Sequence, residues 1–184
     1  MPWKSNFERV SDRLSTEFPG LNVSVHASAE WAENPESLEE AKIAIRHGDI
    51  IVTNLLFIEE HIRAVLPDLQ ARRDHCDAMI CAMSGAEIMK LTRMGKFTMD
   101  GSQSGPMAIL KRLRGNKQSK EKNASDGARQ MAMLRRIPKI LRFIPGTAQD
   151  VRSYFLVLQY WLAGSDENVA NLVRHLVTRF ADGP

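Results

Sequence analysis

Two short apolar runs constrain the fold of this 184-residue chain more than any other feature. Residues 49–53 read DIIVT and residues 77–83 read DAMICAM, and a helical pattern lies between them over residues 57–73. Apolar runs without polar alternation are typical of parallel strands that are covered on both faces. A further strand is predicted at residues 21–26 (LNVSVH), where apolar and polar residues alternate, and a helix at 35–47 follows it.

The order strand, helix, strand, helix, strand predicts an α/β fold with a short parallel βαβαβ sheet and right-handed crossovers. An amphipathic helix at residues 6–18 precedes this pattern. Pro67 either kinks the helix at 57–73 or starts a second helix. Ser84 and Glu87 match a capping box, which predicts another helix from there to about Met94.

The second part of the chain is predicted to be an all-helical segment. It begins with a turn-rich loop at 100–106, a short basic helix at 107–114 and a polar stretch at 115–125, and three helices follow at about 127–143, 147–163 and 166–181. The chain is thus predicted to consist of an α/β half (1–99), a basic loop and linker (100–126), and a helical segment leading into a missing remainder (127–184).

The helix predicted at 147–163 carries apolar residues on nearly all of its sides. Its middle keeps only Arg152, Ser153 and Gln159 as strongly polar residues. Its longest uninterrupted apolar run, 154–158, is much shorter than the roughly 20 residues that span a membrane. We therefore expect no transmembrane segment, and we expect this helix to be sheltered by neighbours that lie outside the chain.

The composition is that of a folded globular protein, with 43% hydrophobic and 26% charged residues. The N-terminus lacks the apolar region of a signal peptide. Cys76 and Cys81 are the only cysteines, which is too few for a disulfide framework and suits a reducing compartment. The sequence therefore predicts a cytoplasmic protein, and the absence of a transit peptide favours a bacterial source.

The charge of the chain is unevenly distributed. Residues 26–60 contain eight acidic and two basic residues, whereas residues 111–142 contain eleven Lys or Arg and two acidic residues. The basic window either meets an anionic partner or is a solvated surface beside a linker. Because it contains no stacking aromatic residue and no known reader motif, we expect no nucleic-acid partner.

Familiar cofactor and metal motifs are absent from the sequence. The glycine-containing stretch at 101–108 (GSQSGPMA) lacks the spacing and the lysine of a Walker A loop, and no GxGxxG follows the first predicted strand. The four residues between Cys76 and Cys81 do not match a zinc spacing. We therefore expect this segment to bind no ATP, NAD or metal in these familiar ways.

Candidate ligand-binding residues follow the two apolar runs. Glu59, Glu60 and His61 come shortly after the first run, and Ser84 comes directly after the second. In open α/β sheets, ligands bind at the carboxyl ends of the strands. Two carboxylates and an imidazole at that edge could move protons or contact a metal. Alternatively, the acids only stabilise a helix dipole and Ser84 is a helix cap.

Eight of the nine methionines lie between residues 79 and 133. These residues either fill a core or line a pocket for a large, flat, apolar ligand, because methionine adapts to irregular shapes. The residues concerned are Met79, Met83, Met89, Met94, Met99, Met107, Met131 and Met133.

Three long strings of the sequence resemble one known family. They are LLFIEEHIRAVLPDLQARRDHCDAMICAMSGAEIMKLTRMGKFTM (55–99), SGPMAILKRLRG (104–115) and RQMAMLRRIPKILRFIPGTAQDVRSYFLVLQYWLAGS (129–165). They closely resemble the N-terminal region of the large porphyrin-binding subunit of magnesium chelatase, called the H subunit. They resemble the cobaltochelatase large subunit more distantly.

The resemblance implies ATP-dependent insertion of Mg²⁺ into protoporphyrin IX, on the path to chlorophyll or bacteriochlorophyll. It implies three kinds of partner: the remainder of the large subunit, the AAA+ ATPase pair (the I and D subunits) that hydrolyses ATP, and protoporphyrin IX. It transfers no catalytic residue to this segment, because the proposed metal-insertion residues of the family lie mostly in the part absent here. The alternative is a stand-alone, non-catalytic module that binds a porphyrin or docks a partner subunit.

Overall fold

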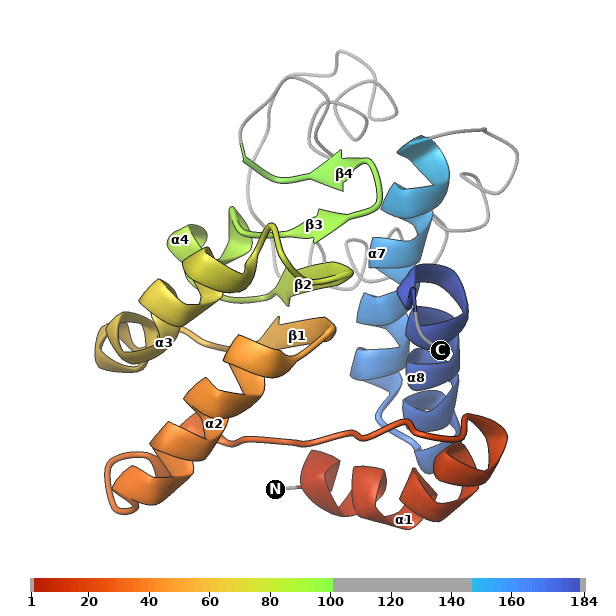
Figure 1. Cartoon of the computed structure of the whole chain (residues 1–184), viewed down its shortest axis with the longest axis horizontal. Coiled ribbons are helices and arrows are strands. Elements are labelled where there is room, and N and C mark those ends of the chain that lie inside the picture. Colours follow the sequence, from red (N-terminus) through yellow and green to blue (C-terminus); the bar gives the residue numbers. More distant parts are fainter. Residues whose placement is uncertain (1, 101–146, 183–184) are drawn as a thin grey trace, which may run out of the picture.

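The structure, a computed structural model, describes residues 2–100 and 147–182 and combines a small sheet with helices on both of its faces (Figure 1). The predicted α/β class with a helical C-terminal part is therefore confirmed. The elements are α1 (Pro2–Glu17), η1 (Ser28–Glu30), α2 (Pro35–His47), β1 (Ile50–Asn54), α3 (Glu59–Arg72), β2 (Ala78–Ala82), α4 (Ala86–Met89), β3 (Arg93–Met94), β4 (Phe97–Thr98), α7 (Thr147–Ala163) and α8 (Asp166–Phe180). The predicted helices at 107–114 and 127–143, most of the predicted linker and the basic window lie outside the described residues, so the division of the chain stays a prediction.

The sheet has four strands in the order β1-β2-β3-β4. β1 and β2 are parallel, with Ile50 opposite Ala78 and Asn54 opposite Ala82. β3 and β4 form a two-residue antiparallel hairpin that extends the sheet beyond β2. The sheet is therefore mixed, and the predicted βαβ crossover accounts for its parallel half.

The strand predicted at residues 21–26 is wrong, because this segment has no regular secondary structure and pairs with no strand of the sheet. Its alternating pattern has another cause. Leu21, Val23 and Val25 line a groove together with Phe7 and Leu14 of α1. The alternation thus places one set of side chains against a helix without a hydrogen-bonded ladder.

The helix predicted at 84–94 is also wrong beyond its first turn. α4 ends at Met89, and the chain then forms the β3–β4 hairpin. The turn needs glycine, because Gly95 has a φ of +57° and a Cβ there would lie 2.7 Å from Oδ2 of Asp150. Asp150 also accepts a hydrogen bond of 3.0 Å from the N–H of Lys96, so α7 holds the hairpin in place.

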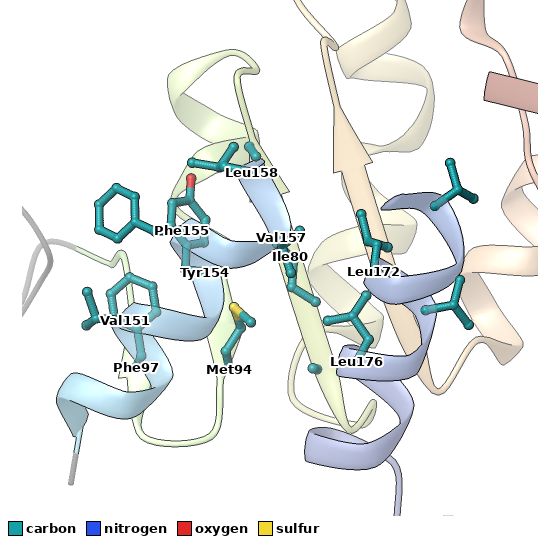
Figure 2. Close-up of a cluster of buried hydrophobic side chains, with 14 of the residues drawn as sticks. Ile80, Met94, Phe97, Val151, Tyr154, Phe155, Val157, Leu158, Leu172 and Leu176 are labelled. Atoms are coloured by element: carbon teal, nitrogen blue, oxygen red, sulfur yellow. The ribbon is translucent and has the colours of Figure 1, made fainter. Parts of the chain in front are cut away.

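β2 lies at the centre of the molecule, and all five of its residues are buried. Since side chains alternate along a strand, Ala78, Ile80 and Ala82 face one hydrophobic cluster, and Met79 and Cys81 face the other. The first cluster contains buried residues of α1, α7, α8 and the hairpin, and Figure 2 shows part of it. The second cluster contains buried residues of α3 and α4, with side chains of α2 packed against it. Burial on both faces explains the uninterrupted apolar run.

The expectation that the apolar helix, α7, needs shelter from outside the chain is wrong for most of its surface. Val151, Tyr154 and Val157 are 0–3% exposed and belong to the cluster formed with β2, the hairpin and α8 (Figure 2). Tyr154 also donates a hydrogen bond of 3.2 Å to the carbonyl of Cys81 in β2. Leu162 remains exposed. None of the described helices is long and apolar enough to cross a membrane.

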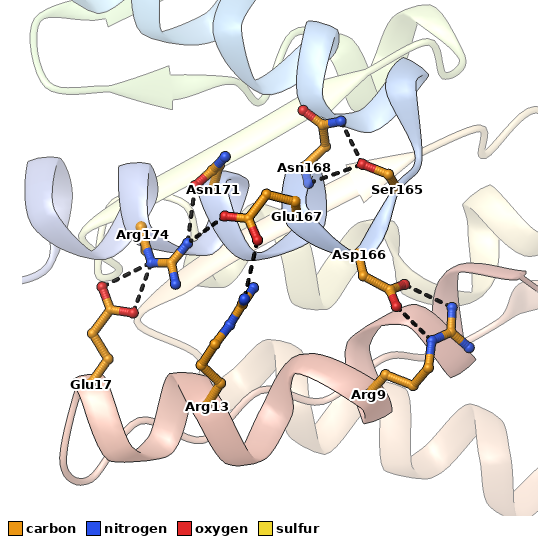
Figure 3. Close-up of polar contacts among 9 residues, drawn as sticks. All are labelled: Arg9, Arg13, Glu17, Ser165, Asp166, Glu167, Asn168, Asn171 and Arg174. Carbon is orange, nitrogen blue, oxygen red and sulfur yellow. Dashed lines mark hydrogen bonds and ion pairs between the residues drawn. The ribbon is translucent and has the colours of Figure 1, made fainter.

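Charged side chains at the surface form ion pairs between helix α1 and helix α8 (Figure 3). Arg9 forms two hydrogen bonds, of 2.7 and 2.8 Å, with the carboxylate of Asp166. Arg174 in turn binds the carboxylate of Glu17 at 2.7 Å. Below this polar rim, Val10 and Leu14 are buried in the shared core. The first described helix and the last one therefore pack against each other and share the hydrophobic cluster on one side of the sheet.

Candidate functional site

The loops that follow β1 and β2 meet at the carboxyl edge of the parallel strands. The N–H of Leu56 donates to the hydroxyl of Ser84 at 3.1 Å, and the N–H of Gly85 donates to the carbonyl of Leu56 at 2.8 Å. The hydroxyl of Ser84 donates in turn to the carbonyl of Ala82 at 3.0 Å. The first loop thus leads into α3 and the second into α4, and both are joined at this edge.

Ser84 therefore lies at the predicted edge of the sheet, but its hydroxyl is not a helix cap. The N-cap of α4 is Gly85, without a capping side chain. Ser84 holds the neighbouring loop instead, so the capping-box interpretation of Ser84 and Glu87 is wrong. No carboxylate or imidazole bonds to its hydroxyl among the described contacts.

Both loops begin with a backbone conformation that L-residues rarely adopt. Leu55 has a φ of +58° and Met83 a φ of +44°, and they are the only non-glycine residues with positive φ in the described part of the chain. A left-handed L-residue costs roughly 1–2 kcal/mol. Such conformations persist where the surrounding contacts hold them, and they concentrate at functional edges.

Glu59, Glu60 and His61 open α3 as predicted, but they do not converge on one point. Glu59 forms an ion pair of 2.5 Å with Arg63 one turn on, and both side chains are exposed. His61 packs instead against Trp31, with ring centroids 5.5 Å apart and an interplanar angle of 70°. Two residues of helix correspond to about 200° of rotation, so Glu59 and His61 point to opposite sides.

Metal binding is not supported at this edge. No group of three or more His, Cys, Asp or Glu within residues 2–100 and 147–182 is arranged to hold a metal ion. The role of Glu59, Glu60, His61 and Ser84 in binding a ligand stays a prediction. What the edge presents to solvent is mainly apolar, because Leu55, Phe57 and Ile58 are 56–61% exposed.

This apolar surface is the feature that sequence reasoning missed. The stretch LLFI at 55–58 was expected to run into the helix at 57–73, but α3 begins only at Glu59. The sequence did contain a signal for it. Four consecutive apolar residues stand between the strand and the acidic start of the helix, which is more than a short loop needs to anchor itself in the core. Only Leu56 is used in the core.

The two cysteines are core residues. Burial raises the pKa of the Cys81 thiol to about 12, and burial also raises the pKa of Cys76. Thiols with raised pKa values are poor nucleophiles and poor metal ligands at neutral pH. The methionine alternatives are decided in part, since Met79 and Met94 are fully buried in the core. Met107, Met131 and Met133 lie outside the described residues.

Comparison with known proteins identifies the family. Residues 3–155 match the family described as Domain of unknown function (DUF3479), so the chain belongs to that family. It is also similar to the magnesium-chelatase H subunit of Cereibacter sphaeroides, with 55% identity over 94% of this chain. The magnesium-chelatase H subunit of Rhodobacter capsulatus is 51% identical over 95% of the chain. The resemblance to this large subunit is thereby confirmed.

The similarity extends to plants. The chloroplastic magnesium-chelatase ChlH subunit of Oryza sativa is 32% identical over 72% of this chain. In each case the chain matches a small part of its relative. It spans 14% of the length of the two bacterial relatives and 9% of the rice protein.

Proposed function

We propose that this chain is the N-terminal part of the large, porphyrin-binding H subunit of magnesium chelatase. The observation that carries the proposal is 55% identity over 94% of the chain to a protein that bears this name. The whole enzyme is then a ligase that forms nitrogen–metal bonds by inserting Mg²⁺ into protoporphyrin IX, with ATP hydrolysed on the separate AAA+ pair of I and D subunits. Chlorophyll or bacteriochlorophyll synthesis is the process it serves, and the bacterial cytoplasm is its location.

Within that enzyme, the segment acts as a folded support and not as the catalytic centre. Three observations support this role. Its central strand β2 is buried on both faces, its cysteines are core residues with raised pKa values, and Ser84 is engaged with backbone groups. Glu59, Glu60 and His61, in the first turn of α3 directly after the exposed apolar residues 55–58, are the remaining candidates for contacts with a ligand.

A chimeric large subunit tests the proposal directly. The matching region of the Cereibacter sphaeroides protein is replaced by residues 1–184 of this chain, and the product is assayed with the I and D subunits. We expect Mg-protoporphyrin formation within a fewfold of the parent protein. A chimera that folds and assembles but forms no Mg-protoporphyrin would refute the proposal. Glu59→Gln and His61→Gln in the chimera test the remaining candidates, and a change in rate of less than about twofold would show that neither residue makes a ligand contact that the reaction needs.

The alternative, a stand-alone porphyrin-binding module, makes a different prediction. Protoporphyrin IX is titrated into the isolated chain, and the fluorescence of its three tryptophans, Trp3, Trp31 and Trp161, is followed. Saturable quenching, together with an inactive chimera, would favour the module. An active chimera without saturable quenching favours the supporting role.

A further inference from the structure

Exposed apolar side chains are concentrated at one place on the described surface. Six large hydrophobic residues of the described chain are exposed, and three of them, Leu55, Phe57 and Ile58, lie within four consecutive positions. We call these three side chains the 55–58 patch. The others, Val23, Ile43 and Leu162, are scattered singly, which is ordinary for a protein surface.

The exposure of the patch is built into the loop. Leu56 is 5% exposed and anchors the loop in the core, and its N–H and carbonyl groups bond to Ser84 and Gly85. The left-handed conformation of Leu55 turns the chain just before this anchor. Because both backbone groups of Leu56 are held, the backbone of the loop cannot move to bury Leu55 and Phe57 without breaking these bonds.

The neighbouring loop is fitted closely against this arrangement. A Cβ at Gly85 would lie 2.7 Å from Cδ1 of Ile62, a buried residue of the first turn of α3. The loop after β2 is therefore packed closely against the start of α3 and the carbonyl of Leu56. A strained, preformed loop that presents apolar groups outward is suited to contact with another surface.

Charge next to the patch indicates the chemistry of the opposing surface. Glu59 is exposed and already paired with Arg63. Glu60 is exposed and forms no ion pair with any described residue. An apolar surface with a basic group at its rim complements this combination, because opposite charges at a rim orient an interface whose centre is apolar.

The length of the relatives identifies the occupant. This chain spans 14% of the two bacterial relatives that it matches, so most of such a polypeptide lies outside it. Asp182, the last described residue, donates its N–H to Asp77 just before β2, at the opposite end of the strand from the patch. Because the last described residue lies away from the patch, the candidate occupant is a more distant part of the full-length polypeptide.

We propose that the 55–58 patch is the surface on which this unit docks against an apolar, basic-rimmed region of the same large subunit, beyond residue 184. This inference rests on the proposed function, because it requires that the chain be part of that large subunit. A second copy of the large subunit and a lipid surface are competing occupants that the experiment separates.

The test uses the full-length large subunit that contains this segment. The photo-crosslinking residue p-benzoylphenylalanine is placed at position 57, or at position 43 as a control, since Ile43 is 49% exposed on α2. We expect position 57 to crosslink, at the mass of one polypeptide, to a peptide beyond residue 184 that mass spectrometry identifies. Position 43 is expected to give little such product.

Reversing the charge of Glu60 tests whether the opposing surface carries a basic group at its rim. Glu60→Lys is expected to lower the yield of the crosslink from position 57 severalfold, whereas Glu36→Lys on α2 leaves it unchanged. Crosslinking to a second copy, to added lipid vesicles, only within residues 1–184, or not at all would overturn the docking proposal.

A parallel assay separates this failure from failure of the proposed function. The unmodified full-length large subunit is assayed for Mg-protoporphyrin formation with the I and D subunits. An active protein without the crosslink overturns only the docking surface. An inactive protein that gives the crosslink supports docking within the same long polypeptide and overturns the proposed magnesium-chelatase activity.

Discussion

The two faces of the sheet are covered by helices from different parts of the sequence. α2, α3 and α4 cover one face and are interleaved with the strands, so each lies close in sequence to the strand it covers. α7 and α8 cover the other face with α1 packed against α8, and these three helices come from the two extremes of the described chain (Figure 1). On the first face, helices contact strands that are their neighbours in the sequence, because the connections between them are short. On the second, Arg9 and Asp166 meet across 157 positions of sequence.

The distant face, covered by α7 and α8 with α1 packed against α8, is the more vulnerable of the two. The other face, covered by α2, α3 and α4, is called the local face. It can form once β1, α3 and β2 have folded, because closing a short loop costs little entropy. The distant face requires the ends of the chain to come together before Ile80, Met94 and Phe97 are covered. The distant face is therefore the part that depends on the whole chain.

The largest effect is expected from removing the distant face. Ending the chain after residue 146 deletes α7 and α8 and uncovers Ile80, Met94 and Phe97, all of which are 0% exposed. The truncated chain should lose its cooperative thermal transition and bind a hydrophobic dye, because its sheet keeps only one covered face. Circular dichroism melts and dye fluorescence measure this. Ending the chain after residue 182 is the control, and a sharp transition in the 146-residue chain would contradict the dependence on the distant face.

Single core truncations on the two faces come next. Leu14→Ala on the distant face and Leu69→Ala on the local face remove side chains that are each 1% exposed. Each should lower the free energy of unfolding by about 2–5 kcal/mol, through lost burial and a residual cavity. The two residues belong to separate clusters, so the losses should add to within about 0.5 kcal/mol in the double variant. Urea denaturation tests this, and a larger departure from additivity would show that the faces are coupled.

A buried carboxylate is expected to have a smaller effect. Asp150 accepts from the N–H of Lys96 at 3.0 Å and from Arg179 at 3.1 Å, and its side chain is 12% exposed. Asp150→Asn leaves one of these donors facing an amide NH₂ group, which should cost about 1.5–3 kcal/mol of unfolding free energy. Asp68→Asn, which breaks the ion pair with Arg46 on the local face, should cost about 0–1 kcal/mol. Urea denaturation measures both variants. If Asp150→Asn and Asp68→Asn lowered the free energy of unfolding equally, the distant face would not depend more strongly on its polar contacts than the local face does.

The smallest effect is expected at the exposed pair between α1 and α8. The hydrogen bond from Arg9 holds the pKa of Asp166 below its usual value of 3.8, with Arg13 adding to the effect. A lowered folded-state pKa stabilises the fold above pH 3.8, and this contribution is lost as the pH falls through the lowered pKa. Asp166→Asn should therefore reduce Tm slightly at pH 7, and the difference from the parent should vanish in strong acid.

The matched control for this pH dependence lies on the other face. Glu59→Gln removes the exposed pair with Arg63 within α3. It should change Tm less than Asp166→Asn does, because its partner is one turn away and links no distant elements. A Tm difference for Asp166→Asn that persists unchanged below the lowered pKa would show that its charge is not responsible.

The elements that sequence reasoning located well are those with complete local signals. α2 is found at the predicted residues, because Asn34 caps it through bonds to the N–H groups of Glu36 and Ser37, and Gly48 follows its end. α7 begins and ends at the predicted residues as well, and α8 ends one residue earlier than predicted. The strands at β1 and β2 are displaced by a single residue at their ends.

The errors arose where distant contacts replaced local ones. The hydroxyl of Ser84 was expected to serve its own helix, but the N–H of Leu56 from the neighbouring loop occupies it. At the candidate site, the positions of Ser84 and of Glu59 to His61 at the strand ends were predictable from the order of the elements. That Glu59 and His61 point apart, and that the 55–58 patch is left exposed, was not predictable, because exposure depends on which atoms the rest of the chain brings near.

Local patterns in the amino-acid order were enough to establish the α/β class, the two buried parallel strands, the helices with local caps and the resemblance to the magnesium-chelatase large subunit. These depend on hydrophobic period, on capping residues and on long characteristic strings, which can be read without knowing what lies nearby in space. The folded chain was needed to establish that α1 and α8 pack against each other, that most of α7 is sheltered from within, and that three apolar side chains remain exposed. These outcomes depend on long-range packing, in which each surface is covered by whichever element the folded chain brings against it.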